Sequence, residues 1–142
     1  WWTPSSTVFY LEVSPFLYTI RIITFSNYNS HSAPLFNKLA ILKFDDLMFL
    51  NIALFMHDFH SNVFPTSFYN FFTCTKEVHQ YNTRLASKHS YYIPKVRTNY
   101  GIFNIRYAVS KVWNSIQDDL KSKRRTSFKL NLKSSLISKY LN

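Results

Sequence analysis

Two neighbouring carboxylates, Asp45 and Asp46, are the first residues of the chain whose types and spacing could do chemistry. Polymerases use paired aspartates to hold two metal ions. Here Lys43 stands where such a motif has an aromatic residue, and no third carboxylate with similar surroundings lies upstream. The fourteen residues of Leu47–His60 contain no Pro or Gly. We therefore expect the pair to open a helix, where backbone N–H groups and the helix dipole favour negative charge.

The histidines are the next candidates for chemistry. His57 and His60 share one face of the expected helix because they are three residues apart. Zinc needs three or four protein ligands, and Cys74 and His79 would complete a set only by chance. A single glycine, Gly101, also excludes a P-loop, a dinucleotide fingerprint and a nucleophile elbow with its oxyanion loop. We expect no catalytic residue, no metal ligand and no cofactor.

A third set of residues combines positive charge with flat aromatic rings, which suits phosphate contacts and base stacking. Its candidate nucleic-acid-binding members are Arg84, Lys95, Arg97, Tyr100, Arg106, Tyr107, Lys123, Arg124 and Arg125. The alternative is that the arginines pair with acids or water while the tyrosines pack. The basic run of residues 121–125 could serve as a nuclear address or a phosphate clamp, but such runs are more often only solvated linkers.

The charge of the chain is distributed unevenly. The 142 residues carry a formal net charge of +10, with a sequence pI near 9.8. Residues 1–83 contain four Lys/Arg and five Asp/Glu, whereas residues 84–142 contain 13 Lys/Arg and two Asp/Glu. This asymmetry predicts a polyanionic partner for the C-terminal part, most simply RNA or DNA, and the choice between the two stays open.

These candidates require elements to position them. Helical spacing of apolar residues predicts helices within residues 34–73, over 108–121 and over 126–140. The helix from Leu47 is apolar almost all round, with Leu50 and Leu54 on its main stripe, so we expect it to be buried. Residues 91–107 alternate and predict a β-hairpin.

Gly101 lies in the middle of that expected hairpin, where it would supply a positive φ for the turn. The fold predicted is thus mainly α with one β-hairpin, an α+β arrangement. It is a small helical subdomain over residues 26–142, preceded by an irregular, apolar segment over residues 1–25.

The sequence also bears on membrane association and on the location of the protein. The longest strongly apolar run, Leu47–Met56, has ten residues, whereas a membrane span needs about 20. We expect no membrane partner. Cys74 is the only cysteine, so an internal disulfide is excluded and an intracellular location, nuclear or other, is the expectation.

Three short pieces of the sequence carry a family resemblance. They are Tyr81–Arg84 (YNTR), Arg97–Gly101 (RTNYG) and Trp113–Ser115 (WNS), the last followed by the expected final helix. In this order they resemble the C-terminal tail of reverse transcriptases from jockey-like non-LTR retrotransposons. The resemblance covers about residues 21–140.

This resemblance implies a non-catalytic segment of an RNA-directed DNA polymerase, with the polymerase domain of the full-length protein as its partner. The aromatic-x-Asp-Asp motif of that family is absent, so we expect no enzyme activity from this chain alone. Residues 108–110 stand where the family has Gly-Pro, and we expect a truncated or decayed copy of a longer reading frame. The tail is expected to bind nucleic acid. The alternatives are a structural or protein-interaction module and a retroelement remnant without function.

Overall fold

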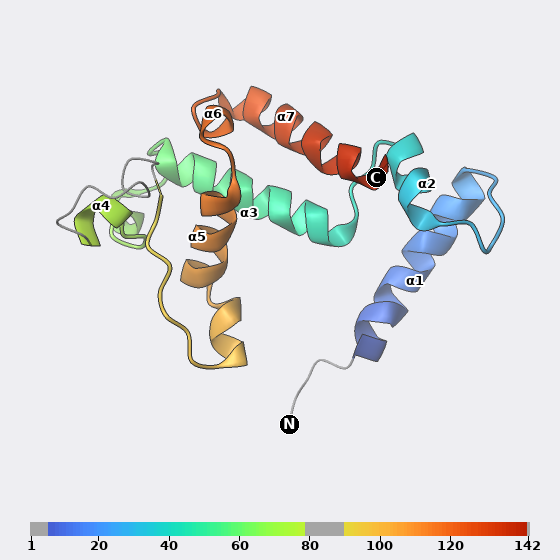
Figure 1. The fold of residues 1–142 in the computed structure, drawn as a ribbon, viewed down its shortest axis with the longest axis horizontal. Coiled ribbons are helices and arrows are strands. Elements are labelled where there is room, and N and C mark those ends of the chain that lie inside the picture. The colour runs from blue at the N-terminus through green and yellow to red at the C-terminus, as the bar shows by residue number, and fades with distance from the viewer. Residues whose placement is uncertain (1–5, 79–89, 142) are drawn as a thin grey trace. The chain divides into compact units, whose positions relative to one another are not determined.

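The computed structural model describes residues 6–78 and 90–141, which are mainly helical, as predicted (Figure 1). Within these residues there is no β-strand; the one isolated β-bridge joins Cys74 and Tyr91. The chain forms two compact units. One contains the residues up to Lys43 together with those from Ser134 onward, and the other contains Phe44–Lys133.

The first unit is built from α1 (Ser6–Ile23), α2 (Ser32–Lys38) and η3 (Lys139–Leu141). Its core contains Ile20 and Phe36, with Leu35 beside them and Leu17, Leu39 and Tyr140 packed around the three. The Tyr140 hydroxyl also accepts a hydrogen bond from the backbone N–H of Lys43, at 3.0 Å. A small aromatic–aliphatic core thus holds this unit together.

The expectation of an irregular segment over residues 1–25 differs from the structure, in which α1 spans Ser6–Ile23. Pro15 lies inside this helix. Proline removes one backbone hydrogen bond from a helix interior. The helix continues because packing of an apolar face stabilises helices more than local propensity does, and Ile20, only 2% exposed, supplies such packing.

The second unit is organised around α3 (Phe44–His60) and α5 (Ile105–Ser115), which pack against each other. After α5 come α6 (Asp118–Lys121) and α7 (Arg125–Ser138), the second of which begins in this unit. Its shorter helices are η1 (Thr66–Phe68), α4 (Thr75–Val78) and η2 (Asn99–Phe103).

The core of this unit lies where α3, α5 and α7 meet. Trp113, Phe128 and Met56 are completely or almost completely buried. The rings of His57, Phe128 and Trp113 form one cluster. The centroid of His57 lies 4.7 Å from that of Phe128 and 6.5 Å from that of Trp113, and the last two lie 6.3 Å apart. Trp113 therefore fixes α5 to α3 and α7.

Helix α3 begins as predicted, with Asp45 and Asp46 in its first turn. The expectation that it is buried all round is wrong near this end. Leu47 is 44% exposed and Met48 is 50% exposed, whereas Leu54 is 9% exposed. The buried residues of α3 lie in its middle and last turns, from Leu50 to Phe59.

The predicted β-hairpin over residues 91–107 is wrong. Its second arm is helical, because Thr98 and Asn104 each cap a new helix. The Thr98 side chain accepts a hydrogen bond from the N–H of Gly101, and that of Asn104 accepts one from the N–H of Arg106. Such caps satisfy the free N–H groups of a helix start and stabilise it by about 0.5–2 kcal/mol. Two helices therefore replace the turn and the returning strand.

Gly101 does not have the positive φ that a hairpin turn would need. It lies inside η2, close to the preceding extended segment. A Cβ atom at this position would lie 2.9 Å from Cβ of Val96 and 3.0 Å from its Cγ1. The only glycine of the chain is therefore required by close approach to Val96.

None of the helices over residues 6–78 and 90–141 combines the length and the apolar character that crossing a lipid bilayer would require.

Candidate nucleic-acid interface

An extended segment, residues 91–98, carries the first of the predicted binding residues. Its beginning is fixed by the antiparallel bridge between Tyr91 and Cys74. Beside the bridge, the carbonyl of Ser90 accepts hydrogen bonds from Thr75, at 3.0 Å from the N–H and 2.9 Å from the hydroxyl. These contacts attach the segment to α4.

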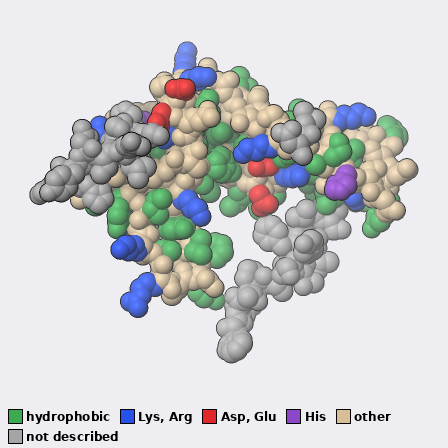
Figure 2. Space-filling model, viewed as in Figure 1, with side chains coloured by type: hydrophobic (Ala, Val, Ile, Leu, Met, Phe, Trp, Pro, Cys, Tyr) green, Lys and Arg blue, Asp and Glu red, His purple; other side chains and the backbone are tan. Residues whose placement is uncertain are grey.

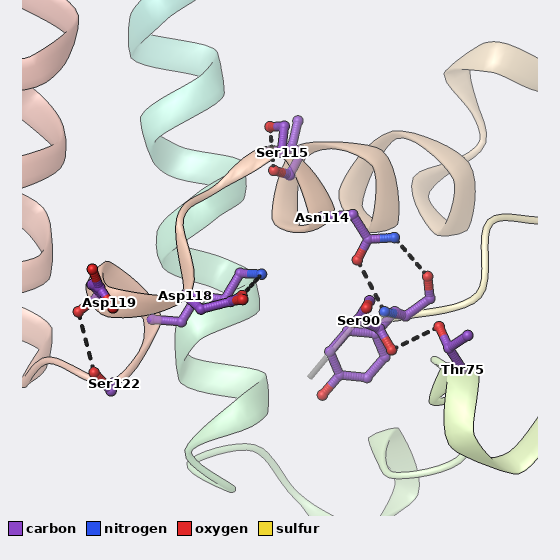
Figure 3. A network of polar contacts seen from close by, with 10 residues as sticks. Thr75, Ser90, Asn114, Ser115, Asp118, Asp119 and Ser122 are labelled. Atoms are coloured by element: carbon purple, nitrogen blue, oxygen red, sulfur yellow. Dashed lines mark hydrogen bonds and ion pairs between the residues drawn. The ribbon is translucent and has the colours of Figure 1, made fainter. Parts of the chain in front are cut away.

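The other edge of Tyr91 is held by Asn114, near the end of α5 (Figure 3). The N–H of Tyr91 donates to Oδ1 of Asn114 at 3.0 Å, and Nδ2 of Asn114 donates to the carbonyl of Tyr91 at 2.8 Å. The side-chain amide thus pairs with both backbone groups of one residue, as a neighbouring strand would. Together the bridge and the amide determine where the extended segment starts.

The Tyr91 side chain is buried and reinforces this anchor. Its ring packs edge-on against Phe59, with centroids 5.8 Å apart, and its hydroxyl lies 3.2 Å from Nδ1 of His60. Burial raises the pKa of Tyr91 to about 12, with smaller contributions from Cys74 and Glu77. The phenol is therefore neutral at physiological pH and serves as an anchor.

Beyond the anchor, charged and aromatic side chains are exposed together. Lys95 and Arg97 are exposed along the extended segment, and Tyr100 and Phe103 on η2 are 70% and 78% exposed. Arg106 is also exposed, at the start of α5. We call these five residues the aromatic–basic surface. This surface presents both flat aromatic rings and positive charge to solvent.

The part of the sequence that carries the aromatic–basic surface contains no acidic residue. No Asp or Glu occurs between Glu77 and Asp118, whereas six Lys or Arg do. In the folded protein, the guanidinium of Arg106 lies 4.6 Å from the ring centroid of Phe71, as a cation–π contact. That contact orients Arg106, which forms no ion pair with the residues of 6–78 and 90–141.

The predicted site residues differ in their exposure and contacts in the structure. Tyr107 is half-buried, and the ammonium of Lys111 lies 5.6 Å from its ring centroid, so its face is not open for stacking. Arg84 lies outside the described residues. Phe103, which lies within the predicted hairpin of residues 91–107, was not among the predicted site residues. Asn104 is a residue type that favours helix N-caps. Treating it as a cap would have ended the predicted strand there and separated Phe103 from it.

The three remaining predicted residues, Lys123, Arg124 and Arg125, lie elsewhere. They are exposed where α6 leads into α7, beyond the C-terminal end of α5, whereas η2 adjoins its N-terminal end (Figure 1). Figure 2 shows Lys and Arg side chains at both places on the face in view. Arg125 forms a bidentate ion pair with Asp58, with distances of 2.6 and 3.0 Å. The structure thus divides the predicted set into two groups.

Metal binding finds no support in the described part of the chain, where no three His, Cys, Asp or Glu side chains lie together as a metal site would require. His57 and His60 instead make packing and hydrogen-bond contacts within the second unit.

Comparison with known proteins gives no relative. No known protein family, no curated protein and no solved structure matches this chain.

Proposed function

We propose that this chain is a non-catalytic module that binds single-stranded nucleic acid through the aromatic–basic surface. The observation that carries the proposal is the exposure of Tyr100 and Phe103 beside Lys95 and Arg97, in a stretch without acids. Exposed aromatic rings stack on unpaired bases, and nearby cations bind the phosphates. Duplexes offer no free base faces, so single strands are the preferred partner.

The resemblance to reverse-transcriptase tails agrees with this function and adds a setting for it. A tail that follows a polymerase domain would hold template or primer strands near that domain. In this proposal the tail contributes affinity, and chemistry belongs to the polymerase domain. Whether RNA or DNA is preferred would depend on contacts to the 2′-hydroxyl.

A protein-interaction module is the second candidate, because the same region also exposes aliphatic side chains. Ile102 and Ile105 are 45% and 49% exposed on either side of Phe103. Exposed apolar groups that lie together often mark protein contacts. The two candidates differ in salt dependence, because apolar contacts do not release counterions from a polyanion.

The test is a fluorescence-anisotropy titration of labelled single strands with a Tyr100→Ala/Phe103→Ala variant. Stacking contributes about 1–3 kcal/mol per base, so affinity should fall at least about fivefold. The matched control is Phe25→Ala/Tyr28→Ala, which removes two aromatic residues that are 98% and 75% exposed in the other unit. Equal loss in both variants, or no loss in the first, would contradict the proposed surface.

A further inference from the structure

A cleft of about 650 Å³ lies at the end of α3, where α6 leads into α7. One wall comes from the last turns of α3, including His57 and Asp58. The other comes from Asp118 and the basic run of residues 121–125. We call it the 121–125 cleft. It lies within the second unit and shares no residue with the aromatic–basic surface.

Both acids of the cleft are already paired. The Lys121 ammonium lies 2.9 Å from Oδ1 of Asp118, and Arg125 forms its bidentate pair with Asp58. Lys121 is itself buried, with its ammonium 5.5 Å from the ring centroid of Trp113. These two pairs therefore shape the cleft and leave no carboxylate to balance further positive charge.

Two cations remain at the rim, Lys123 and Arg124. Both side chains are exposed, and among residues 6–78 and 90–141 neither forms an ion pair. The backbone between them is held from inside, because Nε2 of the buried His57 donates to the carbonyl of Lys123 at 2.9 Å. The cleft thus presents two positive charges on a positioned loop.

The length of α5 separates this pair from the aromatic–basic surface. Eleven residues at about 1.5 Å each give about 16 Å along the helix axis. A strand that keeps stacked, helical geometry rises about 3.4 Å per nucleotide, so this distance corresponds to roughly five nucleotides of a stacked strand.

We propose that a strand stacked on Tyr100 and Phe103 continues along α5 and places a backbone phosphate in the 121–125 cleft, on Lys123 and Arg124. This inference rests on the proposed function and adds a second, separate contact to it. The cleft lining includes no Phe, Tyr or Trp side chain, and its two imidazoles, His57 and His60, already contact other rings, so the cleft takes a phosphate and reads no base. The footprint is therefore longer than the aromatic–basic surface alone.

Strand length tests this footprint. Labelled single-stranded oligonucleotides of four and fifteen nucleotides are titrated with the full 142-residue chain and with a Lys123→Ala/Arg124→Ala variant. A second contact on the same strand adds its affinity through effective concentration. The variant should lose about tenfold or more in affinity for the longer strand. It should keep its affinity for the shorter one, which cannot reach the cleft.

The control is Lys76→Ala/Lys129→Ala, which removes the same charge from exposed positions outside the cleft and the aromatic–basic surface. The cleft variant keeps the backbone carbonyl of residue 123, to which His57 donates. Circular dichroism checks that the variant is folded. An equal loss in the control, or an unchanged affinity of the cleft variant for the longer strand, would overturn the inference. If the unmodified protein binds neither strand, the proposed function fails as well.

Discussion

Asn114 holds Tyr91 in the way that a neighbouring strand would, with one side-chain amide in place of a stretch of backbone. This matters because, within the described part of the chain, the β-bridge of the extended segment of residues 91–98 lies at its start, at Tyr91. The sequence predicts a helix over residues 108–121, which includes Asn114. It could not assign the partner of Asn114, because an amide has no periodicity that would reveal it.

Replacing Asn114 with Ala should destabilise the protein by about 1–3 kcal/mol, because the N–H and carbonyl of Tyr91 would lose their partners. Asn114→Asp should cost at least as much, since a carboxylate oxygen would face the Tyr91 carbonyl. The measurement is urea unfolding, with Ser115→Ala as the neighbouring control. Its exposed hydroxyl bonds only the carbonyl of Val112, so its loss should stay within about 0.5 kcal/mol. Equal values for the two Ala variants would contradict the role of the amide.

Gly101→Ala should be destabilising by about 1–3 kcal/mol, as overpacked positions are, although Ala favours helices. The cause is the approach of the new Cβ to Val96. Adding Val96→Gly should remove much of this cost, so the two changes should be less than additive in thermal unfolding. A neutral Gly101→Ala would show that the segment moves aside freely.

At the scale of elements, helices were predictable where the apolar period is long, and α7 over Arg125–Ser138 overlaps the range expected from its stripe. The hairpin was wrong because alternation over residues 91–107 outweighed the cap residues Thr98 and Asn104. For the same reason the site was predicted only in part, since Phe103 fell within the predicted hairpin and was not among the candidate residues. The strand partner of Tyr91 is Cys74, a non-local contact that no local pattern encodes.

Helix α3 provides a matched pair for testing where the core lies. Leu54→Ala should cost about 2–5 kcal/mol, because this residue is 9% exposed and its removal leaves a cavity. Leu47→Ala, on the same helix but 44% exposed, should cost far less. Chemical denaturation of the two variants measures the difference. Similar losses would mean that the first turns of α3 are as enclosed as its middle.

At the scale of the whole molecule, the chain combines a basic C-terminal part with elements that hold two groups of cations apart. The charge asymmetry was evident from composition, whereas its division into two groups was not. That division depends on the length and position of α5 (Ile105–Ser115). In this account the protein acts by binding and carries no reaction of its own.

Purified protein should therefore show no template-dependent DNA synthesis. Asp45 and Asp46 belong to the first turn of α3, and no metal-binding cluster exists in the described residues. Primer extension on an RNA template with Mg²⁺ is the measurement, with a known reverse transcriptase as the positive control. Labelled product from this chain alone would contradict the non-catalytic assignment.

The salt dependence of single-strand binding tests the central claim most directly. Lys95, Arg97 and Arg106 can each neutralise one phosphate, and each such contact contributes about −0.7 to the slope of log affinity against log salt. We predict a slope of about −2 or steeper for a fifteen-nucleotide strand, measured by fluorescence anisotropy between low and physiological salt. No binding at low salt, or an affinity that does not change with salt, would contradict the account.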